Sequence, residues 1–325
     1  MRLPGTGRLR KAGRGIRRKF VKPALILLYH RVAELRLDSQ LLAVTPAHFA
    51  EQLDILKRRA RPVSLDELTK RLGSGELPER AVAVTFDDGY ADNLQNAKPL
   101  LESQGVPATV FVTTGYVEGQ REFWWDELEG LLLEAPSNGQ KLELTIDGVV
   151  RRWSENDFQR AYHEIFAAMR AMPDSERGNI LEQLRSWAGR GAACRPSHRP
   201  LSSDEVRELP RSDVVEVGAH SRTHPVLSGL PVPAQREEVE GSKADLERIL
   251  GRPVTSFAYP YGTEADYSAE TVRIVRSAGF GSACVNVADV VWRGTDRFEI
   301  PRLLVRNWDA TTFERQLEEW FDGRM

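Results

Sequence analysis

The stretch AVAVTFDDGYADN, residues 81–93, decides how the rest of the chain is interpreted. Its first six residues are apolar or β-branched and predict a strand that is buried on both faces. Asp87 and Asp88 follow this strand directly, and Gly89 lets the backbone turn sharply. Two adjacent carboxylates are costly to bury without partners, and barrels of parallel strands carry their catalytic residues at this end of the strand. The stretch therefore predicts a functional site at Asp87 and Asp88.

Strands and helices alternate on both sides of this stretch. Before it, the sequence predicts a strand at 24–29, a helix at 46–59 opened by Thr45 and Pro46, and a short helix from Ser64. After it, we expect a helix at 93–104, strands at 106–112, 214–217, 255–259, 280–285 and 298–305, and helices at 234–250, 264–278 and from 311 onward. About seven strands that alternate with helices predict an α/β fold whose parallel strands close into a barrel.

Residues of about 120–200 interrupt this alternation. They predict a hairpin turning at Asp147-Gly148 and two helices, at about 155–171 and 174–189. We interpret them as a mainly helical insertion subdomain in a barrel domain of residues 24–325.

The N-terminal segment has a composition of its own. Residues 1–22 carry nine basic side chains, four glycines and no acidic residue. Without these nine, the chain's 45 basic residues fall to 36 against 47 acidic ones, so the remaining body has a charge of about −11. Residues 1–23 are therefore predicted to be an arm that is disordered alone and is either solvated or attached to an anionic membrane surface.

No apolar run near the N-terminus is long enough to cross a membrane. The longest, 24–29, falls far short of the roughly 20 residues that a spanning helix needs. We expect a cytoplasmic protein, possibly peripheral at the inner face of the membrane, with no nucleic-acid partner. Cys194 and Cys284 form no CxxC pair, so they predict neither a disulfide nor a metal site.

A second polar cluster, GAHSRTH at 218–224, follows the predicted strand 214–217. His220 and His224 are four residues apart, so a helical turn would bring both to one metal ion. With Asp88 they form a ligand set that suits a first-row divalent cation and leaves positions open for water and substrate. His198, in a proline-rich loop, is expected to be solvated.

Three motifs resemble those of the polysaccharide deacetylases, the NodB-homology or carbohydrate esterase 4 group. TFDDGYADN (85–93) is similar to the first motif, GAHSRTH to the second and FAYPYG (257–262) to the third. The third motif and LLYHRV (27–32) resemble the poly-N-acetylglucosamine deacetylase branch. The resemblance spans residues 24–305 apart from the insertion. It implies a distorted (β/α)7 barrel and a divalent metal ion, most often Zn²⁺.

The resemblance also implies an activity and a role for each matched residue. The protein would be a hydrolase that removes an N-acetyl group from a bacterial cell-surface glycan, or from a lipid-linked or nucleotide-linked precursor. Asp88, His220 and His224 would bind the metal ion. Asp87 would be the base for a metal-bound water that attacks the amide carbonyl, and the backbone N–H of Tyr261 would help to hold the oxyanion.

The sequence departs from the family pattern at two points. Many members begin the third motif with an Arg that orients the base, but Ala258 stands here, so Arg302 is the candidate replacement. Many members also take the acid for the leaving amine from a His near the C-terminus, but no His follows His224. His30, at the end of the first strand, is the candidate acid; the alternative is a hydrogen-bonded structural histidine.

Other interpretations remain. A catalytically inactive barrel that binds a glycan or scaffolds a partner would fit both departures. An aspartate-nucleophile phosphatase needs one residue between its two Asp residues, which are adjacent here, and would leave the His pair without a role. Trp124 and Trp125 either stack on a sugar ring or anchor the insertion to the barrel.

Overall fold

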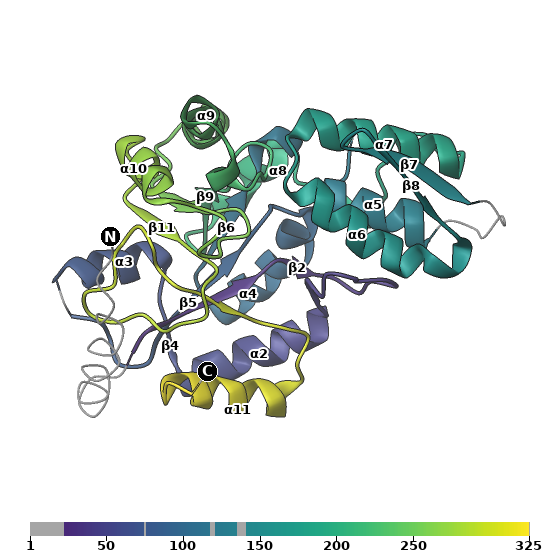
Figure 1. Cartoon of the computed structure of the whole chain (residues 1–325). Helices are drawn as coiled ribbons and strands as arrows, with labels where there is room; N and C mark the ends of the chain where they lie inside the picture. The colour runs from purple at the N-terminus through teal and green to yellow at the C-terminus, as the bar shows by residue number, and fades with distance from the viewer. Residues whose placement is uncertain (1–22, 75, 118–120, 135–140, 325) are drawn as a thin grey trace, which may run out of the picture.

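The computed structural model describes residues 23–74, 76–117, 121–134 and 141–324 (Figure 1). All of the predicted arm except Pro23 lies outside these ranges. Within them, no helix combines the length and the apolar character needed to span a bilayer.

A parallel sheet forms the centre of the barrel. Its strands lie in the order β11 (Ser282–Cys284), β10 (Ser256–Ala258), β9 (Val215–Ala219), β6 (Ala108–Val112), β5 (Ala81–Phe86), β1 (Leu25–Tyr29) and β12 (Leu303–Leu304), and β4 (Arg61–Pro62) pairs with β5 off this path. Every residue of β1, β5 and β6 is buried, because helices cover the outer face and side chains fill the interior.

One extended segment, residues 300–305, closes the sheet. At its start, the carbonyl of Ile300 accepts a 2.9 Å bond from the N–H of Val285, just after β11. At its end, the N–H of Val305 donates a 2.9 Å bond to Leu28 of β1. The predicted distorted (β/α)7 barrel is thus confirmed, and its distortion lies at this seam, which a single short segment bridges.

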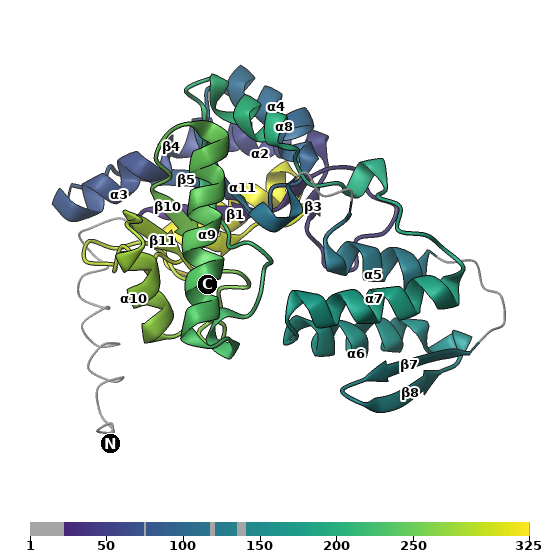
Figure 2. The same ribbon diagram turned by 90° about the horizontal axis from the view of Figure 1, so that it is seen from above.

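Helices cover the outside of the barrel (Figure 2). They are α2 (Pro46–Arg59), α3 (Leu65–Ser74), α4 (Lys98–Gln104), α8 (Ser203–Glu208), α9 (Val232–Leu250), α10 (Ala269–Ser277) and α11 (Ala310–Phe321). As the sequence predicted, the hydroxyl of Thr45 caps α2 and Pro46 is its first residue. Gly105 ends α4 in the left-handed conformation, with a φ of 63°.

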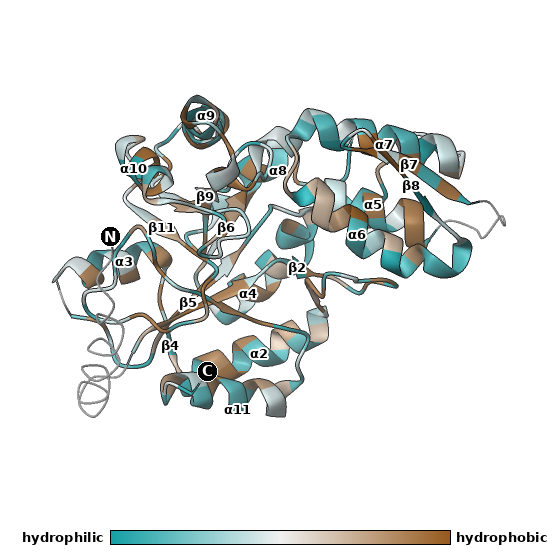
Figure 3. Cartoon of the chain, viewed as in Figure 1, coloured by the Kyte–Doolittle hydropathy of each residue, from teal (hydrophilic) through white to brown (hydrophobic). Residues whose placement is uncertain are grey.

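The insertion lies beside the barrel, and its hydrophobic cluster also takes in Tyr90 and Tyr116 from the barrel (Figures 1 and 3). It contains α5 (Trp124–Leu133), β7 (Leu142–Ile146), β8 (Val149–Trp153), α6 (Phe158–Arg170) and α7 (Asp174–Ala188). The hairpin turns at Asp147 and Gly148, with φ values of 52° and 73°, as expected for a two-residue turn with both residues left-handed. A small parallel pair, β2 (Arg31–Val32) and β3 (Ala43–Val44), lies near the insertion.

The predicted start of the helix at 264 is wrong. The helix, α10, begins at Ala269, because Asp266 accepts hydrogen bonds from the backbone and the hydroxyl of Thr263. Such a side-chain turn competes with helix formation. Ser268 then caps α10 by accepting from the N–H of Thr271.

Candidate active site

Residues that follow four strands of the barrel meet in one pocket. The pocket has a volume of about 270 Å³. Among the residues that line it are His30 after β1, Asp87 and Asp88 after β5, His220 and His224 after β9, and Tyr261 after β10. The structure therefore brings six of the seven predicted site residues to one rim. The seventh, Arg302, lies buried behind it.

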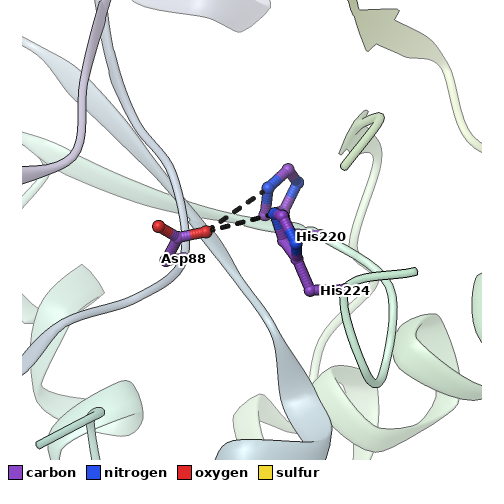
Figure 4. Close-up of side chains that lie close together, drawn as sticks. All are labelled: Asp88, His220 and His224. Atoms are coloured by element: carbon purple, nitrogen blue, oxygen red, sulfur yellow. Dashed lines mark ion pairs between the residues drawn. The ribbon is translucent and has the colours of Figure 1, made fainter. Parts of the chain in front are cut away.

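Asp88, His220 and His224 direct their polar atoms toward one another (Figure 4). Oδ1 of Asp88 lies 3.6 Å from Nε2 of His220 and 3.5 Å from Nε2 of His224. Tetrahedral ligands at about 2.1 Å from a zinc ion would lie roughly 3.4 Å apart. The three residues form a candidate metal-binding group with suitable donors and spacing.

A backbone carbonyl determines which nitrogen of His220 carries the proton. Nδ1 of His220 lies 2.8 Å from the carbonyl oxygen of Ala258. Because a carbonyl only accepts, Nδ1 carries the hydrogen, and the neutral ring presents the lone pair of Nε2 toward Asp88. Nδ1 of His224 is buried without a partner among the described residues.

The predicted helical turn across the two histidines is wrong. Ser221 and His224 adopt left-handed conformations, with φ values of 61° and 55°, and the hydroxyl of Ser221 accepts from the N–H of His224. Glu238 of α9 accepts from the backbone N–H groups of Arg222 and Thr223, each at 2.8 Å. These bonds hold a strained turn that an isolated peptide would not favour.

The insertion also contacts this turn. Arg177 of α7 donates from Nη1 to the carbonyl oxygens of Thr223 and His224, at 3.1 and 3.3 Å. The ring of Trp125, from α5, lies 4.8 Å from that of His224 between centroids and lines the pocket. Trp124 instead packs in the core of the insertion. The insertion is thus part of the pocket wall, and the two tryptophans have different environments.

Arg302 pairs with Asp87. Its Nη1 and Nη2 donate to the two carboxylate oxygens at 2.7 and 2.6 Å, and the arginine side chain is fully buried. Burial alone would raise the pKa of Asp87, but the charge of Arg302 and its two hydrogen bonds outweigh that effect and hold the pKa below its usual value. Asp87 is therefore ionised, and its oxygens keep lone pairs for a further hydrogen bond.

The pKa of Asp88 is shifted in the opposite direction from that of Asp87. Burial, followed by the charges of Asp87 and Asp126, raises its pKa well above the usual value. Burial also lowers the pKa of both His220 and His224, so neither histidine readily supplies a positive charge. This donor set is short of positive charge, and a divalent cation would compensate it.

His30 and Tyr261 complete the predicted set. Nδ1 of His30 is buried without a partner among the described residues, and burial lowers the pKa of His30 to about 4. Tyr261 has a φ of 58°, and its ring packs edge-on against His224. Within the described ranges, its backbone N–H has no hydrogen-bond acceptor.

A second group of possible ligands lies nearby. Asp126, Glu129 and His198 approach one another within 4.8 Å, and the expectation that His198 is solvated is wrong, since the residue is only 5% exposed. Burial and the charges of Arg31 and Arg195 lower the pKa of His198 to about 3. Each carboxylate accepts a hydrogen bond from outside the group, Asp126 from the hydroxyl of Tyr90 and Glu129 from the N–H of Ser39, both at 2.7 Å.

The sequence reasoning missed other residues of the pocket. Arg306 follows the strand segment that closes the barrel and lines the pocket, so the rule about strand ends could have found it. Arg170 and Phe166 reach the pocket from α6. No pattern in the sequence indicates how α6 is placed against the barrel.

The fold and the site together define an α/β barrel protein with a group of potential metal ligands at the carboxyl ends of its strands. The family profile described as polysaccharide deacetylase matches residues 74–173 and 174–283, more than half of the chain. The chain belongs to the polysaccharide deacetylase family. The matched ranges include the insertion, which the motifs alone left outside the resemblance.

Relatives and solved structures agree with this assignment. Poly-beta-1,6-N-acetyl-D-glucosamine N-deacetylase of Staphylococcus aureus is 31% identical over 113 residues, a match covering 31% of this chain and only 39% of the relative. The structure of IcaB from Ammonifex degensii aligns with a TM-score of 0.61 and 23% identity, covering 93% of this chain and 98% of that one. The Streptococcus pyogenes deacetylase PplD aligns with a TM-score of 0.61 and 18% identity, covering 91% and 98%. At these identities, the two structures support the fold.

Proposed function

We propose that this protein is a metal-dependent hydrolase that removes the N-acetyl group from an acetamido sugar. The observation that carries the proposal is the pairing of two arrangements in one pocket. Asp88, His220 and His224 form a compact ligand set, and Asp87 beside them is held ionised by Arg302. The name of the Staphylococcus aureus relative supports this reaction class.

The site residues divide into those that hold a cation and those that handle protons. We assign Asp88, His220 and His224 to a divalent cation, with Zn²⁺ the first candidate because the set joins two imidazoles to one carboxylate. The cation would supply Lewis acidity toward a water molecule and the amide carbonyl. Asp87 accepts the proton of the attacking water, and Arg302 fixes the plane of that carboxylate and keeps it ionised.

The remaining roles fall to Tyr261 and His30. The backbone N–H of Tyr261, which has no acceptor among the described residues, donates to the oxyanion that develops on the amide oxygen. His30 delivers a proton to the leaving amine. Since the pKa of His30 is lowered to about 4, His30 starts neutral, so the proton that Asp87 takes from the water would pass to His30 and from there to the leaving amine.

The test compares the wild-type protein with Asp87→Asn. The probes are N-acetylglucosamine oligomers, and the measurement is the release of acetate and of free amine. Chelation should abolish activity and added Zn²⁺ should restore it, while Asp87→Asn should lower kcat by roughly a hundredfold or more. Asp54→Asn, which removes an exposed carboxylate of α2 paired with Arg58, is the matched control and should retain activity.

Two outcomes oppose the proposal. Full activity in Asp87→Asn would remove the assigned base. Binding of N-acetylglucosamine oligomers with no hydrolysis of any acetamido sugar, at saturating Zn²⁺, would favour an inactive glycan-binding barrel.

The place of action is a separate proposal that rests on the sequence. Nine basic side chains in residues 1–22 suit an anionic membrane surface on the cytoplasmic side. A deletion of residues 1–22 should lower co-sedimentation with vesicles that contain anionic lipid. Equal co-sedimentation of the two proteins would oppose the idea.

A further inference from the structure

Arg306 lies in the wall of the same pocket as the metal-binding group. It follows β12 and is half-buried, and Leu304 and Gln40 line the same pocket. With a volume of about 270 Å³, the pocket is close to the roughly 300 Å³ at which small-molecule sites begin, so it suits a single sugar unit. A group on that sugar would therefore come within reach of Arg306 while the acetamide lies at Asp88.

The other two arginines at the pocket are neutralised by carboxylates. Arg302 pairs with Asp87, and Nη2 of Arg170 lies 2.5 Å from Oδ1 of Asp266. Arg306 forms no ion pair with any residue that the structure describes. Only its Nη1 is engaged, in bonds to the backbone carbonyls of Gln40 and Leu41 at 3.3 and 2.5 Å.

The acidic residue that most affects Arg306 is already engaged. Asp38 accepts from the N–H groups of Leu42 and Ala43 at 2.8 and 2.9 Å, one to each carboxylate oxygen. Burial lowers the pKa of Arg306, and the charge of Asp38 only partly offsets the effect. The guanidinium thus carries a positive charge whose lost hydration is not fully compensated.

Arg177 shows what a purely structural arginine looks like in this fold. It also lacks a carboxylate partner among the described residues, but all three of its nitrogens donate to backbone carbonyls, and it does not line the pocket. Arg306 differs because Nε and Nη2 have no acceptor within the described part of the chain. This free edge can form two parallel hydrogen bonds with a planar or tetrahedral oxyanion.

We propose that Arg306 binds an anionic group, a phosphate or a carboxylate, carried by the sugar whose acetamide is hydrolysed. This inference rests on the proposed deacetylase function and narrows its substrate to anionic acetamido sugars. With Arg302 and Arg170 already paired, the charge of Arg306 is available to the ligand. A phosphate ester and a carboxylated sugar would present the same chemistry to it, so the experiment must separate them.

The experiment measures kcat/KM for three probes at saturating Zn²⁺. They are neutral di-N-acetylchitobiose, N-acetylglucosamine 1-phosphate and N-acetylmuramic acid. The wild-type protein should prefer one anionic probe over the neutral probe by roughly tenfold to a hundredfold, as expected for charge-assisted hydrogen bonds. The preferred probe identifies phosphate or carboxylate as the recognised group.

Variants then assign the preference to Arg306. R306Q should bring the ratio of anionic to neutral kcat/KM close to one, mainly through a higher KM for the anionic probe. R306K, which keeps the positive charge but loses the two parallel N–H donors of the guanidinium, should give an intermediate ratio. Arg236→Gln, which alters an exposed arginine of α9 paired with Glu240, should leave the ratio unchanged.

The outcomes separate this inference from the proposed function. Turnover of the neutral probe with no anionic preference, or a preference that R306Q retains, overturns the role of Arg306 and leaves the deacetylase function in place. If no probe is hydrolysed but an anionic sugar binds the wild type at least tenfold more tightly than R306Q, the deacetylase function fails and the anion site stands. Equal binding to both proteins, without turnover, overturns the anion site as well.

Discussion

Arg302 forms a two-point ion pair with Asp87, at 2.7 and 2.6 Å, although 215 positions separate them in the sequence. Asp87 follows β5, whereas Arg302 lies in the segment that closes the barrel between β11 and β1. The pair therefore links the closure of the fold to the charge state of the proposed base.

Replacing Arg302 should affect both stability and activity. In Arg302→Gln, Asp87 remains buried without its cation, and breaking a buried pair from one side costs about 3–5 kcal/mol of unfolding free energy. Urea unfolding measures this loss, and the double variant Asp87→Asn/Arg302→Gln should lose less than the sum of the single variants. Unchanged unfolding of Arg302→Gln would contradict the prediction.

The same pair shows how far the sequence could lead. Ala258 stands where many members of the family that the motifs resemble have an arginine, and Arg302 was therefore predicted as its replacement. Barrel closure was predictable because apolar runs alternate with helical segments. The bidentate geometry of the pair between Arg302 and Asp87 was not predictable, since it depends on how far the segment that closes the barrel extends past β11.

The histidine turn shows where sequence reasoning failed. The spacing of His220 and His224 predicted a shared site, yet the helical turn that it suggested is absent. Glu238 and Arg177, both distant in the sequence, hold the turn through its backbone atoms. Such bonds to backbone atoms leave no periodic pattern in the sequence. The proximity of His220 and His224 could therefore be predicted, but the conformation of the turn between them could not.

Arg177→Met should weaken metal binding. The change leaves the carbonyls of Thr223 and His224 without their donor, so the turn that presents His224 loses its support. Loss of such a supporting contact typically lowers metal affinity about tenfold to a hundredfold. Competition with a chromogenic chelator measures the Kd for Zn²⁺ in the folded variant.

Arg185→Met is the matched control for this prediction. It removes another arginine of α7, whose Nε donates to Glu127 within the insertion at 2.6 Å. It should lower the stability of the insertion without changing the Kd for Zn²⁺. Equal loss of zinc affinity in both variants would mean that Arg177 acts through general destabilisation.

Metal removal should lower the melting temperature. A cation that binds the folded site alone stabilises it by about 2.7 kcal/mol at a free concentration of 100 Kd. At roughly 2 °C per kcal/mol for a large domain, Tm should rise by about 5 °C when Zn²⁺ is added to protein treated with EDTA. Differential scanning fluorimetry records the shift. A similar shift in His220→Ala/His224→Ala would show that the ion binds elsewhere.

Asp126 should make stability depend on pH in a direction unusual for a carboxyl group. Burial, only partly offset by Arg31 and Tyr90, raises its pKa from 3.8 to about 7. The folded state therefore binds more protons than the unfolded state between about pH 4 and 7, so this contribution to stability is lost as the pH rises through that window.

Asp126→Asn removes the titration while keeping an oxygen that can accept from the hydroxyl of Tyr90, the present partner of Asp126 at 2.7 Å. Between pH 5 and pH 8, the wild type should lose about 2.5 kcal/mol of unfolding free energy relative to this variant. Urea unfolding at both pH values measures the difference, and exposed Asp54→Asn should track the wild type. A stability difference between the wild type and this variant that stays constant from pH 5 to pH 8 would mean that Asp126 is already ionised at pH 5 and that the charge of Arg31 outweighs burial.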